Sequence, residues 1–95
     1  MARVYCRRNE TNTLDFYVAD KGCEYYLFSQ KAYLGVEKHF RNGVTLSNAI
    51  NHSKGRADYM IHKTMSKLPM YIKYVEKEYG IALLEQSKRR LANVA

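Results

Sequence analysis

The chain has 95 residues and a formal net charge of +7, from sixteen Lys and Arg against nine Asp and Glu, and 46% of its residues are hydrophobic. This length predicts one domain with a single core, which needs no metal or disulfide framework to hold it. The excess of positive charge favours a polyanionic partner such as DNA or RNA. The alternative explanation of the charge is solubility, which small bacterial proteins often achieve in this way.

The chain start and the two cysteines indicate the compartment. The first residues contain no apolar run long enough for a signal peptide or a membrane span. We therefore expect a cytoplasmic, reduced protein that does not interact with membranes. Cys6 and Cys23 are then expected to be small buried hydrophobic side chains, because cytosolic disulfides are rare and two cysteines alone make a poor zinc site. Neither a metal nor a cofactor is predicted.

Three strands are predicted in the first third of the chain. Apolar residues alternate with arginine and tyrosine over 3–8, and again with polar residues over 14–19. The sequence Asp20-Lys21-Gly22 predicts a type I turn with Gly22 in the left-handed conformation, followed by a third strand over 23–28. Sequence adjacency makes these strands an antiparallel three-stranded meander.

Two short helices should follow the meander. The first is predicted from Gln30 to Arg41, with Ser29 as its N-cap and glycine after its end. Asn42-Gly43 is also a hairpin motif, but the preceding helical spacing favours the helix. A second short helix is expected after Thr45, and it ends in a polar loop over 51–55.

The longest predicted helix runs from Arg56 to Tyr79 and ends at Gly80. Its apolar residues recur every three or four positions, at Ile61, Met65, Leu68, Ile72, Val75 and Tyr79. Pro69 lies inside this stripe, where it removes a backbone hydrogen bond and predicts either a bend or two nearly collinear helices. A stripe this long would overhang a small domain, which suggests a homodimer.

The fold class that these elements predict is α+β: an N-terminal three-stranded antiparallel meander packed by two to three helices, the longest at about 56–79. The domain should span residues 1–86. Residues 81–86 form either a strand or another helical turn. Residues 87–95 are predicted to be a basic, mobile end, since they lack the apolar density to pack.

The outward face of the 56–79 helix is the first candidate site. It carries lysines interleaved with tyrosine and methionine, and no carboxylate. Lysines one turn apart can follow a row of phosphates, and exposed tyrosines can stack on unpaired bases. The alternative is a solvated surface, or one whose tyrosines pack under another element. The predicted nucleic-acid-binding residues are Lys63, Lys67, Lys73, Lys77, Tyr59, Tyr74, Lys88, Arg89 and Arg90.

The strands supply a second candidate surface. If Tyr5 and Tyr17 point to solvent, they form an aromatic and arginine surface suited to single-stranded nucleic acid or to a protein partner. The alternative is that these tyrosines are core or dimer residues. The other members of this set are Arg3, Arg7, Arg8, Tyr25 and Tyr26.

No catalytic residue is assigned. His39, His52 and His62 are not spaced as a helical metal pair, and a general-base role for His52 beside Ser53 and Lys54 would need a second converging site. No phosphate-binding loop or nucleophile motif is present. We therefore expect a non-enzymatic protein, with a small ribonuclease-like activity as the least favoured interpretation.

Two functional hypotheses remain from the sequence. The first is a small nucleic-acid-binding accessory or regulatory protein that contacts mainly the phosphate backbone. The second is a protein-interaction module, an adaptor or inhibitor, that grips its partner with tyrosine and methionine. The anchors expected for the second hypothesis are Met60, Met70, Tyr59 and Tyr74.

Overall fold

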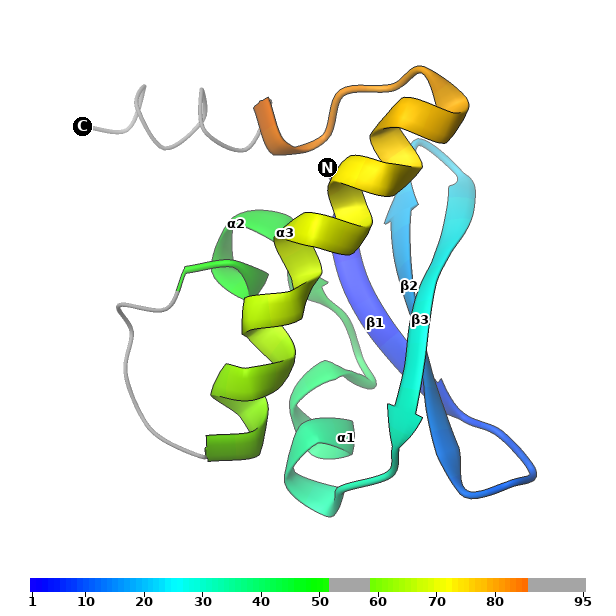
Figure 1. Cartoon of the computed structure of the whole chain (residues 1–95), viewed down its shortest axis with the longest axis vertical. Coiled ribbons are helices and arrows are strands. Elements are labelled where there is room, and N and C mark those ends of the chain that lie inside the picture. Colours follow the sequence, from blue (N-terminus) through cyan, green and yellow to red (C-terminus); the bar gives the residue numbers. More distant parts are fainter. Residues whose placement is uncertain (52–58, 86–95) are drawn as a thin grey trace.

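In the computed structural model, which describes residues 1–51 and 59–85, helices cover one side of a four-stranded antiparallel sheet (Figure 1). The strand order is β3-β2-β1-β4. The predicted α+β class and N-terminal meander are confirmed. The elements in chain order are β1 (Arg3–Arg8), β2 (Thr13–Asp20), β3 (Cys23–Lys31), α1 (Leu34–Phe40), β4 (Val44–Thr45), α2 (Leu46–Ala49) and α3 (Tyr59–Tyr79).

The hairpin between β2 and β3 has a different turn type from the one predicted. Lys21 has φ 52° and Gly22 has φ 81°, so both residues of the two-residue loop are left-handed. This is a type I′ turn, because its twist matches that of the flanking strands, whereas a type I turn would splay them. Asp20 and Cys23 accordingly pair directly across the turn.

The predicted helix start at Gln30, with Ser29 as its N-cap, is wrong. Ser29 lies in β3 opposite Asp15, and its hydroxyl donates a 2.6 Å hydrogen bond to the Asp15 carboxylate. Cross-strand pairing extends β3 to Lys31, so α1 begins only at Leu34. The helix after β3 is confirmed over the rival hairpin, and the Gly43 N–H closes its end on the Phe40 carbonyl at 2.9 Å.

The fourth strand was not predicted. β4 consists of only Val44 and Thr45, which pair with Val4 and Arg3 of β1. Two residues are too few to show the alternation by which a strand is recognised. The single-turn helix α2 then begins directly at Leu46, in agreement with the second short helix expected there.

One extra residue in β3 lets two neighbouring residues face the core. Phe28 pairs with Phe16, and Tyr26 pairs with Tyr17, so Leu27 between them has no partner on β2. Such a β-bulge shifts the alternation by one residue. Leu27 and Phe28 are both buried as a result, and Tyr26 lies on the opposite face of the sheet.

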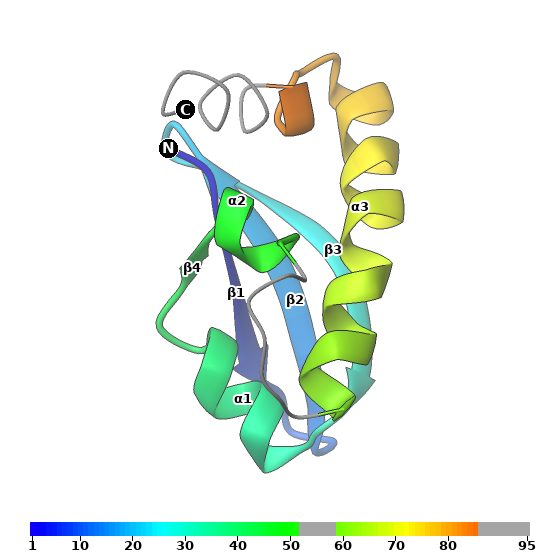
Figure 2. The same ribbon diagram turned by 90° about the vertical axis from the view of Figure 1, so that its left-hand side faces the viewer.

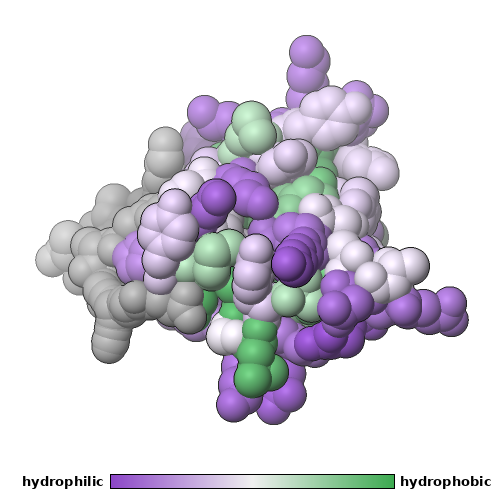
Figure 3. All heavy atoms as spheres, turned by 60° about the horizontal axis from the view of Figure 1, so that its bottom comes forward, coloured by the Kyte–Doolittle hydropathy of each residue, from purple (hydrophilic) through white to green (hydrophobic). Residues whose placement is uncertain are grey.

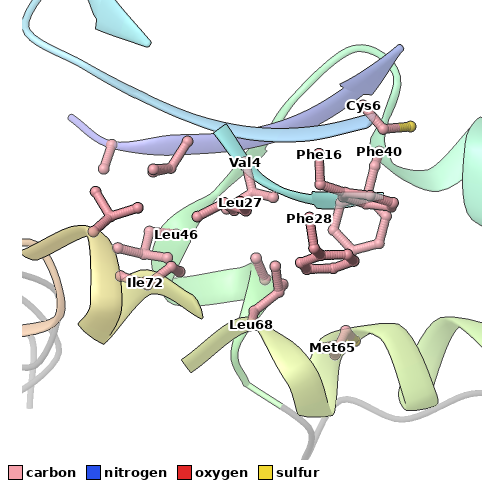
Figure 4. Close-up of a cluster of buried hydrophobic side chains, with 14 of the residues drawn as sticks. Val4, Cys6, Phe16, Leu27, Phe28, Phe40, Leu46, Met65, Leu68 and Ile72 are labelled. Atoms are coloured by element: carbon pink, nitrogen blue, oxygen red, sulfur yellow. The ribbon is translucent and has the colours of Figure 1, made fainter. Parts of the chain in front are cut away.

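The core lies between the sheet and the helices (Figure 4). Figure 2 shows α1 and α2 in front of the sheet, with α3 running along the β3 side. The buried stripe of α3 is confirmed for Met65, Leu68, Ile72 and Val75. Tyr79 was predicted to belong to this stripe, but it is 62% exposed. Its ring contacts the ring of Tyr25, with the two centroids 4.8 Å apart.

α3 is one helix through Pro69, so the division into two helices is wrong. The helix spans Tyr59–Tyr79 without a break, and Pro69 is half-buried beside the core stripe. Tertiary packing of this stripe overrides the unfavourable proline, since most helix stability in proteins comes from such packing. The predicted start at Arg56 and the loop at 51–55 fall largely on 52–58, outside the described residues.

Residues 81–85, the described part of the chain after Gly80, return to the core and form no strand. Gly80, with φ 65°, follows the helix, and the Ile81 N–H donates to the Glu76 carbonyl at 3.2 Å, which is a Schellman closure. The Glu76 carboxylate also accepts the backbone N–H groups of Leu83, at 2.5 Å, and Leu84, at 2.7 Å. Both leucines are buried, and residues 84 and 85 are helical.

None of the helices in the described ranges combines the length and the apolar character that a membrane span requires.

Candidate nucleic-acid interface

The exposed face of α3 carries lysines, tyrosines and a methionine. Tyr59 is 74% exposed, and Met70 and Tyr74 are each 63% exposed. The carboxylates of this helix, Glu76 and Glu78, both lie in its last turns, and Glu76 is turned toward the segment after the helix. The residues that we call the α3 basic face are Tyr59, Lys63, Ser66, Met70, Lys73, Tyr74 and Lys77, all of them exposed.

Three lysines are spread along this face. At 1.5 Å per residue, Lys63 and Lys77 are about 21 Å apart along the helix axis, and Lys73 and Lys77 are about 6 Å apart. The Lys63 ammonium also lies 6.0 Å from the Tyr59 ring centroid, one helical turn away. Because α3 is continuous through Pro69, these lysines belong to one helix face.

Lys67, the fourth predicted lysine, lies beside this face and is turned toward β3. Its ammonium donates a 2.9 Å hydrogen bond to the Gln30 side-chain carbonyl and lies 5.1 Å from the Phe28 ring centroid. Burial, and secondarily the nearby Lys63, lowers the pKa of Lys67 below its usual value. Lys67 therefore joins α3 to the sheet, with little of its charge offered to a ligand.

Gln30 completes this connection between β3 and α3. Its amide NH₂ donates to the Thr64 hydroxyl at 3.0 Å, and that hydroxyl donates in turn to the Met60 carbonyl at 2.8 Å. Met60 is half-buried and packs against the core, so it is not an exposed anchor. The network fixes the rotation of α3 about its own axis, and hence which residues reach solvent.

The predicted basic residues at the chain end, Lys88, Arg89 and Arg90, lie outside the described residues, as does His52. Of the other histidines, His39 is exposed beside the Phe40 ring and His62 is half-buried. In residues 1–51 and 59–85, no group of three or more His, Cys, Asp or Glu side chains could hold a metal ion.

The two cysteines have different surroundings. Cys6 is 2% exposed, and burial is the main cause that raises the pKa of its thiol to about 11. The prediction that both thiols are buried is wrong for Cys23, which is exposed. Cys23 is the first residue of β3, next to the turn, where the helices do not cover the strand.

The side of the sheet that faces away from the helices is the second surface. Tyr5, Tyr17 and Tyr26 stand in one row across three strands. The predicted solvent orientation of Tyr5 and Tyr17 is thus found, whereas Tyr25 points to the helix side, against Tyr79. The predicted set did not include Asp15 and Glu24 of the same side, which only the strand register brings next to the arginines.

The end of the molecule formed by α1 and the β1–β2 connection is mostly hydrophilic (Figure 3). Seen from this end, apolar side chains make small separate areas between polar ones (Figure 3). One of these apolar side chains is Leu34, at the start of α1, which is 63% exposed. Scattered exposed apolar residues of this kind are normal on soluble domains and do not define a site.

No protein-family model, curated protein or solved structure matches this chain.

Proposed function

We propose that this protein binds nucleic acid through the α3 basic face, contacting mainly the phosphate backbone. The observation that carries the proposal is the set of exposed Lys63, Lys73 and Lys77 on one face of a continuous helix, between which no carboxylate lies on that face. A net charge of +7 acts in the same direction, since it attracts polyanions at long range.

The arrangement favours phosphate contacts over base recognition. A lysine ammonium is a flexible point charge without the planar fork that reads a base edge in two places. Tyr59 and Tyr74 add aromatic rings beside the lysines, and such rings stack on unpaired bases with little sequence preference. We therefore expect weak, salt-dependent binding without strong sequence specificity, as in an accessory or regulatory protein.

The test is a binding titration with labelled duplex and single-stranded oligonucleotides, followed by fluorescence anisotropy at several salt concentrations. If the three lysines each neutralise a phosphate, they contribute about −2.7 to the slope of log K against log salt on a duplex, and about −2.1 on a single strand. The variant Lys63→Gln, Lys73→Gln and Lys77→Gln should lose this part of the slope.

A matched control separates this face from overall charge. Lys21, Lys31 and Lys38 are exposed lysines on other elements, and their replacement with Gln removes the same three charges. The control variant should retain the wild-type slope. Absence of binding at low salt, or an equal loss in the two triple variants, would contradict the proposal.

A further inference from the structure

The open side of the sheet presents side chains in three rows, each drawn from β1, β2 and β3. The outer rows contain opposite charges, and the central row is aromatic. We call this surface the open sheet face. Its rows are Arg3, Ala19 and Glu24; Tyr5, Tyr17 and Tyr26; and Arg7, Asp15 and Ser29.

This face is poorly suited to nucleic acid. The rings of Tyr5 and Tyr17 stack on each other, with centroids 5.4 Å apart and planes 17° apart. The Arg7 guanidinium lies 4.7 Å from the Tyr17 centroid and 5.5 Å from that of Tyr5, so the ring faces that a base would use are already in contact. Asp15 and Glu24 would in addition repel phosphates.

The same features suit a protein interface. Exposed tyrosine and arginine are the residues most often found to dominate binding energy at such interfaces. Two of the three hydroxyls in the row have partners, since Arg7 donates to the Tyr5 hydroxyl at 2.9 Å and Tyr26 shares a 2.6 Å hydrogen bond with Ser29. Covering these two hydroxyls with a partner would therefore leave neither of them unpaired.

The strand register makes the row of Arg3, Ala19 and Glu24 complementary to itself. A two-fold axis parallel to the strands and above β2 would place β1 over β3 of a second copy while keeping each row in line. Arg3 would then stand opposite Glu24 of the second copy, twice by symmetry, and Tyr17 would meet its own equivalent.

The same axis would place Asp15 opposite its own equivalent, but Asn9 and Ser29 already donate hydrogen bonds to each of these carboxylates. An axis across the strands would instead place Arg3 opposite Arg7 in two symmetry-related pairs, which brings more like charges together.

We propose that the open sheet face is the interface of a symmetric homodimer, with the two sheets packed face to face and reciprocal Arg3–Glu24 pairs. The sheets of such sandwiches lie about 10 Å apart with strands within about 30° of each other, a gap that tyrosine side chains fill. Arg7 donates to Glu24 Oε1 at 3.1 Å, and Arg3 donates through Nη2 to the Gly43 carbonyl at 2.9 Å, so the Arg3 guanidinium keeps further N–H donors for this contact. The proposal is independent of nucleic-acid binding, since α3 lies on the other side of the sheet (Figure 1).

The decisive experiment is sedimentation equilibrium of the full chain over a range of micromolar concentrations. The wild type should reversibly dimerise. Arg3→Glu alone and Glu24→Arg alone should each weaken dimerisation on the order of tenfold or more, because each places like charges in both symmetry-related pairs. The double variant, with both changes in one chain, should recover most of the wild-type affinity.

Two more variants test the centre of the interface. Tyr17→Lys places two positive charges on the symmetry axis and should abolish the dimer. Tyr74→Lys makes the same change at an exposed tyrosine of α3 and should leave the dimer unchanged. Circular dichroism establishes that each variant is folded.

A measurement on the unaltered protein covers the case in which a variant does not fold. On dilution, NMR shifts of the wild type should change at Tyr5, Tyr17 and Tyr26 and not at Tyr74. A monomer at every concentration, a dimer whose shifts map to α3, or a double variant as weak as the single ones would each overturn the proposal.

Discussion

Replacing Glu76 with alanine should release the segment that follows α3. The Glu76 carboxylate accepts two backbone hydrogen bonds, from Leu83 at 2.5 Å and from Leu84 at 2.7 Å. Hydrogen bonds to a charged group contribute about 1.5 kcal/mol each at the lower end of their range, so the loss is about 3 kcal/mol. For a domain of this size that lowers the melting temperature by roughly 12–24 °C.

The matched control is Glu78→Ala, which removes the same charge from the same end of the helix. Glu78 is exposed, so this variant should change the free energy of unfolding by no more than about 0.5 kcal/mol. Glu76→Gln keeps an oxygen acceptor without the charge and should lose about half as much as Glu76→Ala. Urea denaturation followed by circular dichroism measures all three, and equal stability of Glu76→Ala and Glu78→Ala would refute the reasoning.

Two further predictions concern titrating side chains. Arg8, whose guanidinium lies 2.7 Å from the Glu37 carboxylate, holds the pKa of that carboxyl below its usual value. This pairing therefore stabilises the fold fully above the usual carboxyl pKa, and its contribution is lost as the pH falls through the lower pKa of the folded state. The difference in unfolding free energy between wild type and Glu37→Gln should shrink in acid. A difference that does not change with pH would contradict this. At pH 8, iodoacetamide should label the exposed Cys23 and spare Cys6, because Cys6 is buried and its pKa is raised to about 11. Cys6 should become labelled only when denaturant is added. Mass spectrometry that finds Cys6 labelled in the native protein would contradict this.

Periodic patterns predicted the parts of the fold that depend on repeated side-chain spacing. The buried stripe of Met65, Leu68, Ile72 and Val75 could be predicted because the spacing of these four apolar residues places them all on one helix face. The same repetition explains why Pro69 does not divide the helix. In β1 and β2 the alternation likewise assigned the two faces of the sheet before the packing was known.

The features that were missed depend on contacts between distant parts of the chain. Ser29 has the local properties of an N-cap, but pairing with Asp15 on the neighbouring strand keeps it in β3. β4 has two residues and no period of its own, and it exists through its pairing with β1. Such outcomes are set by tertiary context, which a local pattern does not contain.

The candidate site was predicted in outline. The helical wheel correctly gathered Lys63, Lys73 and Lys77 with Tyr59 and Tyr74 on the exposed side of α3. The wheel could not show that Lys67 turns toward the sheet and away from solvent, because a long flexible side chain at the edge of a helix face bonds whichever acceptor lies within reach. That acceptor, Gln30, is 37 residues away in sequence.

The bulge at Leu27 makes the length of β3 as consequential as its composition. A substitution of Leu27 would change only how well the core is filled. Loss of Leu27 would remove the bulge but leave Tyr26 opposite Tyr17 and Phe28 opposite Phe16, so both halves of β3 would keep their faces and the core would lose one leucine. Loss of Tyr26 would instead leave Leu27 to pair with Tyr17 and to face the open side. That deletion would alter the core and the open sheet face together, which no single side-chain replacement could do.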